Sequence, residues 1–372
     1  MGQAFGLRRP SRPPRSDHIL RLWVRRLPWR GRLREPPQAG GLPHFGTLVE
    51  SHLKSRSARI RSLAKVNLDL RVLNRRDDGF HELRTVFQTI SLADTIEISY
   101  EKARRTELSI DDPLAIPDNL VLRAARSVLE ELGLHGRVSF RLQKRIPMGG
   151  GLGGGSSNAA AVLLALPVLA GRNIPLDRLS EIGAALGSDV PFFLLGGTAV
   201  GLETGTEVYP LPDWTPKPIL VVSPGVHVAT GPAYQALRRG SLTVADRSRK
   251  INTFQSFLSE EGNSFGVNDF EAVVFRQYPQ LKTLAGKLRK LGASGARMTG
   301  SGSAIVAMFD SREQREFAKG VLKKDKVTGR YSVMPAALVS RRSYQRLWRH
   351  QLSEHLSADQ TIWPPQSRYA AR

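Results

Sequence analysis

Cysteine is absent from the 372-residue chain, and so is any long apolar run. The first absence excludes disulfides, thiolate catalysis, iron–sulfur clusters and cysteine-ligated zinc, and favours a reducing, cytoplasmic setting. The second excludes a membrane-spanning helix, which needs about 18 or more consecutive apolar residues. The chain is nevertheless 41% hydrophobic, which is enough for a sizeable core. Its length predicts two domains of ordinary size, or one domain with large additions.

Acidic residues are scarce at both ends of the chain. The formal net charge of +22 would by itself suggest nucleic acid or an anionic surface as the partner. However, residues 1–62 hold 14 basic and 3 acidic side chains, residues 338–372 hold 6 and 2, and residues 63–337 hold 35 and 28. Most of the excess is therefore peripheral, and we do not expect the central part to bind nucleic acid.

Residues 1–58 are predicted to form a disordered basic extension. They contain seven prolines and show no hydrophobic periodicity, so they cannot bury enough surface to offset their ordering entropy. Three origins stay open: a transit peptide, an arm that binds RNA or DNA, and translated upstream sequence. A transit peptide should be amphipathic and serine-rich as well as arginine-rich, and a nucleic-acid-binding arm should carry interleaved aromatic residues. If the extension is translated upstream sequence, the true start lies further along the chain, with Val49 a plausible site.

Polar and apolar residues alternate from Lys65 to Val72, which predicts a half-buried strand. Lys65 and Asn67 fall on its polar side. A second strand is predicted over 86–100 and a helix over 118–133, with Asp118 as a candidate N-cap. A short strand over 138–142 then leads directly into a glycine-rich loop.

This loop is the most informative segment of the chain. Six glycines in seven positions allow positive φ angles, so that successive N–H groups can converge on one anion. Ser156 or Ser157 is expected to cap a helix over 159–166, whose N-terminus attracts negative charge. We therefore expect bound phosphate, although a flexible hinge is the alternative. The candidate nucleotide-binding residues are Pro147, Met148, Gly149, Gly150, Gly151, Leu152, Gly153, Gly154, Gly155, Ser156 and Ser157.

Two familiar phosphate-binding motifs fit this loop poorly. The P-loop motif requires a lysine that the loop lacks. The dinucleotide pattern matches at Gly149, Gly151 and Gly154, but a run of glycines matches it by chance. That pattern also needs an acidic residue at the end of a following strand, whereas Asp177 follows Pro175 where a helix is predicted to begin.

Five blocks of sequence carry a resemblance to a known superfamily. They are 64–68, 75–83, the glycine loop, 187–193 and 299–303. In this order they resemble the GHMP kinases, which include galactokinase, homoserine kinase and mevalonate kinase. The first two blocks narrow the resemblance to a branch that phosphorylates the 2-hydroxyl of a cytidine-diphosphate-linked polyol on the non-mevalonate route to isoprenoid precursors.

The resemblance implies an α+β fold with the two-domain GHMP kinase architecture. A ribosomal S5 domain 2-like N-terminal domain, which binds ATP, is expected over 59–215, and a ferredoxin-like C-terminal domain over 216–339, with the small-molecule substrate in the cleft between them. Alternating strand and helix patterns in the second half agree with this arrangement. The basic, aromatic tail 340–372 lies beyond the residues that the resemblance covers. It could pack on the surface, bind a partner or do neither. The oligomeric state stays open.

Lys65 and Asp189 are the candidate catalytic residues. Asp189 precedes Val190-Pro191, where a carboxylate could cap a helix or accept a hydroxyl proton. Lys65 could be an ordinary solvated lysine or could pair with Asp189 and orient it. The resemblance implies the second role for each, because the matching lysine and aspartate form the catalytic pair of the family.

Substrate recognition is also taken from the resemblance, which implies that the cytosine stacks on aromatic rings and is hydrogen-bonded around a histidine. The matching residues are Phe80, His81 and Tyr234, although the family usually has tyrosine in place of Phe80. Asn67 is expected to contact the polyol hydroxyls, and the turn 300–303 to offer backbone donors to phosphate. Magnesium is expected to arrive with ATP and to be held mostly by phosphates and water, since the sequence shows no dedicated carboxylate cage. The alternatives are another GHMP kinase, acting on a sugar, homoserine or a mevalonate-type alcohol, and a nucleic-acid-binding protein.

Overall fold

The computed structural model describes residues 55–76, 79, 81–237, 244–259, 264–358 and 361–370. The chain divides into residues 1–51 and 52–372, and every described residue lies in the second unit. Strand β1 (Arg56–Arg75) begins three residues before the predicted start of the folded part. Most of the predicted extension 1–58 therefore lies outside the described residues.

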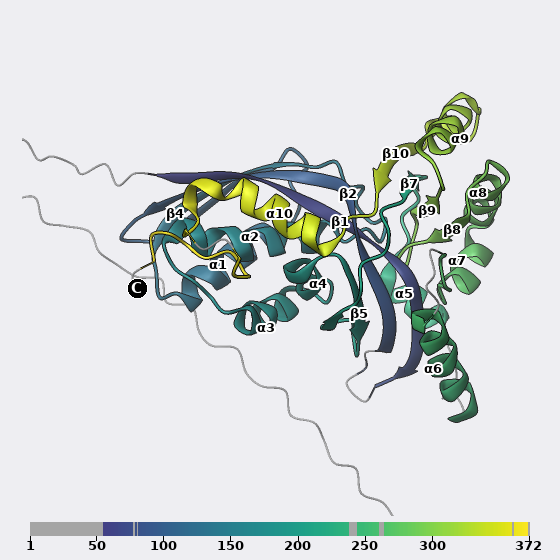
Figure 1. Cartoon of the computed structure of the whole chain (residues 1–372), viewed down its shortest axis with the longest axis horizontal. Coiled ribbons are helices and arrows are strands. Elements are labelled where there is room, and N and C mark those ends of the chain that lie inside the picture. Colours follow the sequence, from purple (N-terminus) through teal and green to yellow (C-terminus); the bar gives the residue numbers. More distant parts are fainter. Residues whose placement is uncertain are drawn as a thin grey trace, which may run out of the picture. The chain divides into compact units, whose positions relative to one another are not determined.

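A long antiparallel strand pair forms the centre of the N-terminal sheet. β1 pairs with β2 from Arg56 opposite Tyr100 to Arg75 opposite His81. The other edge of β2 pairs with β4 along one half and with β5 along the other, which gives the order β3-β4-β2-β5-β6 (Figure 1). Besides β1, the strands of this sheet are β2 (His81–Lys102), β3 (Glu107–Asp111), β4 (Gly136–Gln143), β5 (Thr198–Leu202) and β6 (Glu207–Pro210).

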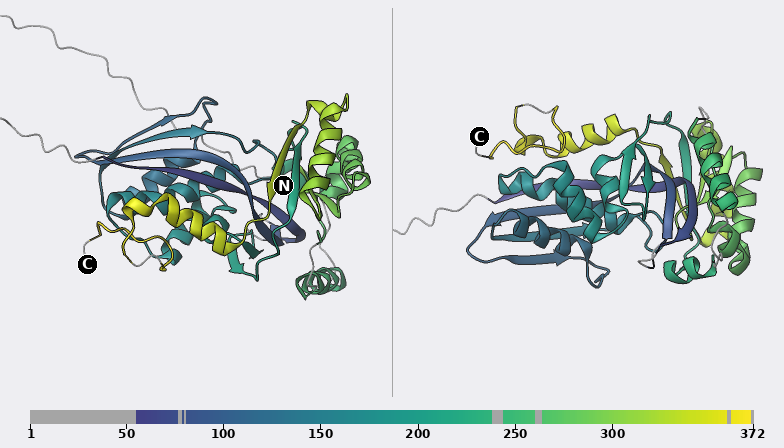
Figure 2. Two further views of the ribbon diagram at one scale, coloured as in Figure 1. Left: turned by 45° about the horizontal axis from the view of Figure 1, so that its top comes forward. Right: turned by 90° about the horizontal axis from the view of Figure 1, so that it is seen from below.

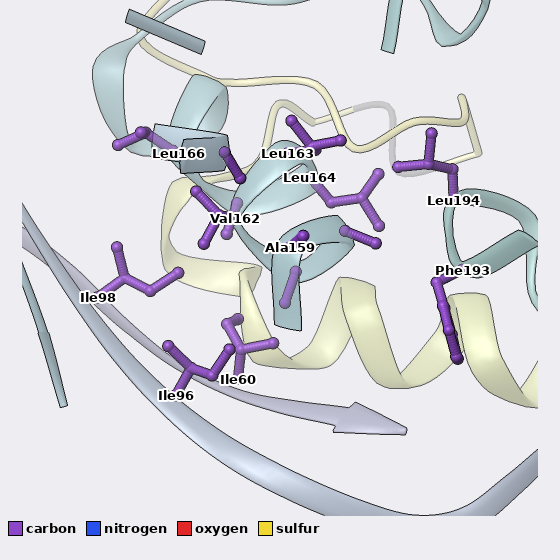
Figure 3. Packing of buried hydrophobic residues seen from close by; sticks show 14 of the residues in the cluster. Ile60, Ile96, Ile98, Ala159, Val162, Leu163, Leu164, Leu166, Phe193 and Leu194 are labelled. Carbon is purple, nitrogen blue, oxygen red and sulfur yellow. The ribbon is translucent and has the colours of Figure 1, made fainter. Parts of the chain in front are cut away.

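Helix α2 (Gly154–Ala170) lies at the centre of the N-terminal core and is buried from Ser157 to Leu169. Its alanines and leucines favour a helix, and an all-round apolar helix must be surrounded by other elements. The sheet, α1 (Leu120–Glu131) and α4 (Val190–Leu195) surround it, and α3 (Leu176–Leu186) packs beside α4. Figure 3 shows the α2 side chains between the sheet residues Ile60 and Ile96 and the end of α4.

The C-terminal lobe has ferredoxin-like topology. Its four antiparallel strands lie in the order β10-β7-β9-β8, and helices pack on one side of this sheet (Figure 1). The alternating strand and helix pattern predicted for this half is thereby confirmed. The strands are β7 (Pro218–Ser223), β8 (Gly295–Met298), β9 (Ile305–Met308) and β10 (Ser332–Ala337), and the helical elements are α5 (Thr230–Ala236), α6 (Val244–Ser259), α7 (Glu271–Gln277), α8 (Pro279–Lys290), α9 (Arg312–Lys324) and the 3₁₀ turn η1 (Thr328–Arg330).

The expectation that β1 is half-buried is wrong. Its polar side is covered as completely as its apolar side, and Lys65, Asp69 and Arg71 are at most 6% exposed. The reason is that β1 runs between the two lobes: Asp189 and the glycine loop lie against Lys65, and residues of the C-terminal lobe lie against Asp69 and Arg71. The buried charges are paired: the Arg71 guanidinium donates to both carboxylate oxygens of Asp69, at 2.8 and 3.0 Å, as burial requires.

The C-terminal tail, which the sequence left undecided, packs on the N-terminal lobe. Helix α10 (Arg341–Gln351) buries Tyr344 and Trp348 in the N-terminal core, and the turn η2 (Ser353–His355) and residues 361–370 follow it (Figure 2). Among the described residues, no helix is long and apolar enough to cross a membrane.

Candidate active site

The glycine loop connects β4 to α2 and is fixed by close contacts with the C-terminal lobe. Gly151 adopts a φ of +73°, and a Cβ atom there would lie 2.1 Å from the Thr299 carbonyl oxygen. Gly153 has a φ of +68° and lies under the Phe193 ring, beside the Lys65 side chain. Only glycine satisfies both the backbone angle and the close approach at these two positions.

A buried carboxylate holds the entrance of the loop. Asp94 is fully buried and accepts hydrogen bonds from the backbone N–H groups of Arg145 (2.7 Å) and Ile146 (2.8 Å) and from the amide of Asn158 (3.1 Å). It also pairs with the Lys144 ammonium, which lies beside the first residue of α2. Lys144 was missed from the sequence, although a basic pair directly before the glycine run was the available signal.

The predicted serine cap is wrong. Helix α2 begins earlier than predicted, at Gly154, so Gly153 is its N-cap and both serines lie within the first turn. Ser157 is 2% exposed, and its hydroxyl donates to the Leu63 carbonyl of β1 at 2.6 Å. Ser157 therefore anchors the helix to the sheet, and the first N–H groups of α2 stay available, as at any helix N-terminus.

Two further loop residues differ in their surroundings. Leu152 is buried among apolar side chains of both lobes, and its carbonyl accepts the backbone N–H of Lys65 at 3.0 Å. Met148, by contrast, is 61% exposed. Leu152 thus fixes the loop against β1, while Met148 stands at its outer edge.

Lys65 and Asp189 meet at the N-terminus of α4. The distance from Lys65 Nζ to Asp189 Oδ2 is 3.3 Å, and the side chain of Asp189 makes no capping hydrogen bond to its own helix. The Lys65 side chain is 4% exposed and that of Asp189 is 29% exposed. Register shifts in the β1–β2 pairing flank Lys65, and such bulges re-aim strand side chains. Asp189 therefore pairs with Lys65 instead of capping α4, and Lys65 is buried instead of solvated.

Asn67 joins this pair to the turn at residues 299–303. Its side-chain oxygen accepts the Lys65 ammonium at 2.9 Å and the Gly300 N–H at 2.9 Å, and its amide nitrogen donates to Thr85 Oγ1 at 2.8 Å. The turn is held from its other side by Asn268, which donates to the Met298 and Gly300 carbonyls. Asn67 thus orients Lys65 in addition to facing the cavity.

An aromatic cluster lies at the other end of the site. The rings of His81 and Tyr234 stack with centroids 5.0 Å apart, and Tyr234 meets Phe270 edge-on at 4.8 Å. Burial, with a smaller effect of the Asp189 charge, raises the pKa of Tyr234 to about 12. Two of the three predicted aromatic-site residues are therefore brought together, while Phe80 lies outside the described residues.

These elements line one cavity of about 450 Å³ between the lobes. It extends from the glycine loop past the Lys65–Asp189 pair to Tyr234 and Phe270. The lining also includes residues that the sequence did not single out as site residues, because they reach the cavity only through the tertiary fold: Leu70, Leu83, Thr85, Phe87, Ser188, Thr204, Gly205, His227, Val228, Ala229 and Thr230. The predicted turn is present in the lining as Gly300, Ser301 and Gly302.

The glycine loop beside a helix N-terminus, the carboxylate paired with a lysine, and the cavity between the lobes together suit a small-molecule kinase. Residues 119–197 match the family model for the GHMP kinases N terminal domain and residues 242–327 that for the GHMP kinases C terminal domain. The chain belongs, within the GHMP kinases, to the 4-diphosphocytidyl-2-C-methyl-D-erythritol kinase family.

Relatives and solved structures support that assignment. The 4-diphosphocytidyl-2-C-methyl-D-erythritol kinase of Solibacter usitatus (strain Ellin6076) is 53% identical over 319 residues, covering 85% of this chain and 98% of that protein. The enzyme of the same name from Geobacter metallireducens is 36% identical, covering 70% and 92%. A crystal structure of 4-(cytidine 5'-diphospho)-2C-methyl-D-erythritol kinase is 36% identical, with a TM-score of 0.62, and covers 75% of this chain and 98% of that one. A mevalonate kinase structure with 15% identity and a TM-score of 0.56 shares the fold.

Proposed function

We propose that this protein transfers the γ-phosphoryl group of ATP to the 2-hydroxyl of 4-diphosphocytidyl-2-C-methyl-D-erythritol. The products are ADP and the 2-phosphate, an intermediate on the non-mevalonate route to isoprenoid precursors. The observation that carries the proposal is the 3.3 Å contact between Lys65 and Asp189 inside a cavity that also reaches the glycine loop and an aromatic cluster. Because ATP is a cytoplasmic metabolite, we place the reaction in the cytoplasm.

The acid–base step falls to Asp189. Its carboxylate accepts the proton of the attacking 2-hydroxyl, and the Lys65 ammonium holds that carboxylate in place and offsets negative charge that develops on the transferred phosphoryl group. Lys65 is itself held by the Asn67 side-chain oxygen. One N–H of the Asn67 amide is engaged by Thr85, and the other is proposed to contact the polyol.

The triphosphate is proposed to lie along the glycine loop and the first turn of α2. The backbone N–H groups there offer a preorganised anion site, and the Lys144 ammonium, which is paired with Asp94, lies beside it. The turn 300–302 closes the same cavity from the C-terminal lobe. Phosphoryl transfer depends mainly on such positioning and charge stabilisation.

Magnesium fits this site as a partner of the nucleotide. Among the described residues, no cluster of three or more His, Asp or Glu side chains could hold a metal ion, and Asp189 is the acidic residue of the cavity lining. Mg²⁺ characteristically keeps several waters and binds through substrate phosphates with one or two carboxylates. The ion would supply charge neutralisation on the phosphates, and the protein would supply at most the Asp189 carboxylate.

The aromatic cluster is proposed to bind the cytosine. Tyr234 and Phe270 line the cavity, and His81 stacks on Tyr234, so a pyrimidine ring has aromatic surface and an imidazole within one small region. The same role is proposed for Phe80, since stacking requires only a ring face. This cluster favours a nucleotide-linked alcohol over a simple one such as mevalonate.

The proposal is tested by coupled ADP release with a panel of alcohols. We expect turnover of the cytidyl substrate and none of mevalonate, homoserine or galactose. Asp189→Asn should lower kcat by roughly two to four orders of magnitude, the usual effect of losing a positioned base, while the KM for ATP stays within about threefold. The control is Asp310→Asn, an exposed carboxylate after β9, which should behave as wild type. Turnover of mevalonate alone would reject the substrate, and a near wild-type Asp189→Asn enzyme would reject the base.

A further inference from the structure

The C-terminal segment 341–370 is built into the N-terminal lobe. Tyr344 and Trp348 are 2% and 1% exposed and belong to the same apolar cluster as α2 and α4. The segment lies beyond the match to the C-terminal family model, which ends at residue 327. The match to the crystal structure of 4-(cytidine 5'-diphospho)-2C-methyl-D-erythritol kinase covers 98% of that chain but only 75% of this one. About a quarter of this chain therefore has no counterpart in that structure.

The segment satisfies the free carbonyls at the end of α4. The last carbonyls of a helix have no partner within the helix. In α4, the Phe193 carbonyl accepts the Tyr344 hydroxyl at 2.5 Å, and the Leu194 carbonyl accepts the Trp363 indole N–H at 2.9 Å. The Tyr344 ring also packs directly on the backbone of Gly196, the C-cap of α4. Figure 3 shows Phe193 beside the ribbon of α10.

Helix α4 is the element that presents Asp189. Asp189 is its N-cap, four residues before Phe193, and the Phe193 ring and the Lys65 side chain both lie against Gly153. A rigid shift of this short helix therefore moves the carboxylate and changes its distance from Lys65. It also moves the ring that covers the glycine loop.

The same segment is attached to the strand that presents Lys65. The backbone N–H of Arg61 donates to Gln351 Oε1 at 2.8 Å, and His355 Nε2 lies 2.9 Å from the Ser57 carbonyl. Arg61 is four residues before Lys65 on β1. One short segment thus contacts both elements that carry the proposed catalytic pair.

We propose that Tyr344 and Trp363 are positioning residues, which hold α4 so that Asp189 stays within reach of Lys65 and of the acceptor hydroxyl. This inference rests on the proposed function. Burial raises the pKa of the Tyr344 hydroxyl, so it stays a hydrogen-bond donor over the whole working pH range. The two donors come from residues 19 positions apart in the segment, so the whole folded tail is required to present them together.

The test removes the two donors and keeps the rings. Tyr344→Phe deletes only the hydroxyl, and Trp363→Phe deletes the indole N–H. A misplacement of about 1 Å in a catalytic group costs roughly 100-fold in rate, so we expect the double variant to lose about tenfold in kcat, with both KM values within about twofold. Trp348→Phe is the matched control, because it changes a buried ring of α10 whose indole N–H donates to none of the α4 carbonyls that Tyr344 and Trp363 bind. It should lower the Tm and leave kcat within about twofold.

A second readout does not depend on activity. Hydrogen exchange of the amides at 190–196 should be faster in the double variant than in the wild type or in Trp348→Phe. Unchanged kcat in a folded double variant overturns the proposal, and so does a kcat loss in Trp348→Phe that matches the loss in the double variant. If the wild type does not phosphorylate the cytidyl substrate, the proposed function fails, and the exchange measurement alone decides: equal exchange at 190–196 in all three proteins overturns the positioning role.

Discussion

Replacing Gly151 by alanine tests the contact between the glycine loop and the C-terminal lobe. The added Cβ would lie 2.1 Å from the Thr299 carbonyl oxygen and 2.9 Å from its carbonyl carbon. The closest favourable carbon–oxygen contacts are about 3.3 Å, so the loop and the turn must separate by roughly 1.2 Å. Both partners are backbone, so no side-chain rotation relieves the clash.

The magnitude follows from this displacement. A shift of about 1 Å at a reacting centre costs roughly 100-fold in rate, and we expect that loss in kcat/KM for ATP. Gly151 also has a φ of +73°, which costs an alanine about 1–2 kcal/mol in folding stability. For a domain of this size, each kcal/mol corresponds to a fall in Tm of about 2–4 °C.

Gly133→Ala separates the two effects. Gly133 has a φ of +61°, but a Cβ there meets no atom within 4 Å. It should therefore show the backbone cost in thermal melting and keep wild-type kinetics. Steady-state assays and melting curves of both variants are the measurement. If Gly151→Ala keeps a kcat/KM within threefold of that of Gly133→Ala, the close approach of loop and turn does not matter for nucleotide binding, and the reasoning is refuted.

Three further predictions concern the cavity wall. Tyr234→Phe should leave the KM for the cytidyl alcohol within about threefold, whereas Tyr234→Ala should raise it roughly tenfold or more, because a stacked base is worth about 1–3 kcal/mol; steady-state assays at saturating ATP measure both. Asn268→Asp would turn a carboxylate toward the Met298 and Gly300 carbonyls, so its Tm should fall, with a loss of about 1–3 kcal/mol or more; an unchanged Tm contradicts this. Tyr234 has a raised pKa of about 12, so its contribution to stability is complete below pH 10 and is lost as the pH rises toward 12; the absorbance titration of tyrosinate should lose a step near pH 12 in Tyr234→Phe.

The sequence alone predicts those parts of the site that are formed by residues adjacent in the chain. The glycine run and the helix after it lie together in the chain, so their geometry follows from local backbone rules. The Lys65–Asp189 pair joins residues 124 positions apart, and only the family resemblance brought them together. From the residues alone, a cap and a solvated lysine were equally good or better readings.

Local rules failed where the tertiary structure overrides them. Asp118 was the candidate N-cap of the first helix, but the Asn119 side chain accepts the Val121 N–H and α1 begins at Leu120. Ser157 has the chemistry of a cap but is drawn away to the Leu63 carbonyl of β1. In both cases the residue at the N-cap of the helix lies one or a few positions away from the residue that the sequence favoured.

The docking of the tail could be foreseen only in part. Tyr344, Leu347, Trp348 and Leu352 recur at helical spacing, which indicates an amphipathic helix with an apolar face. What this face meets was not predictable, because Tyr344 on the helix and Trp363 beyond it donate to backbone carbonyls of α4. Every residue type offers such a carbonyl, so no sequence signal marks these.

The course of β1 through the molecule limits how the enzyme can move. Ile60 packs in the cluster around α2, Val66 in the cluster at the junction of the lobes, and Leu70 in the cluster of the C-terminal lobe. A hinge motion that rotated one lobe against the other would have to pull β1 out of at least one of these three apolar clusters. We therefore expect substrates to enter and leave through fluctuations of individual loops rather than by rotation of one half against the other. Heating should melt both halves together, in a single cooperative transition.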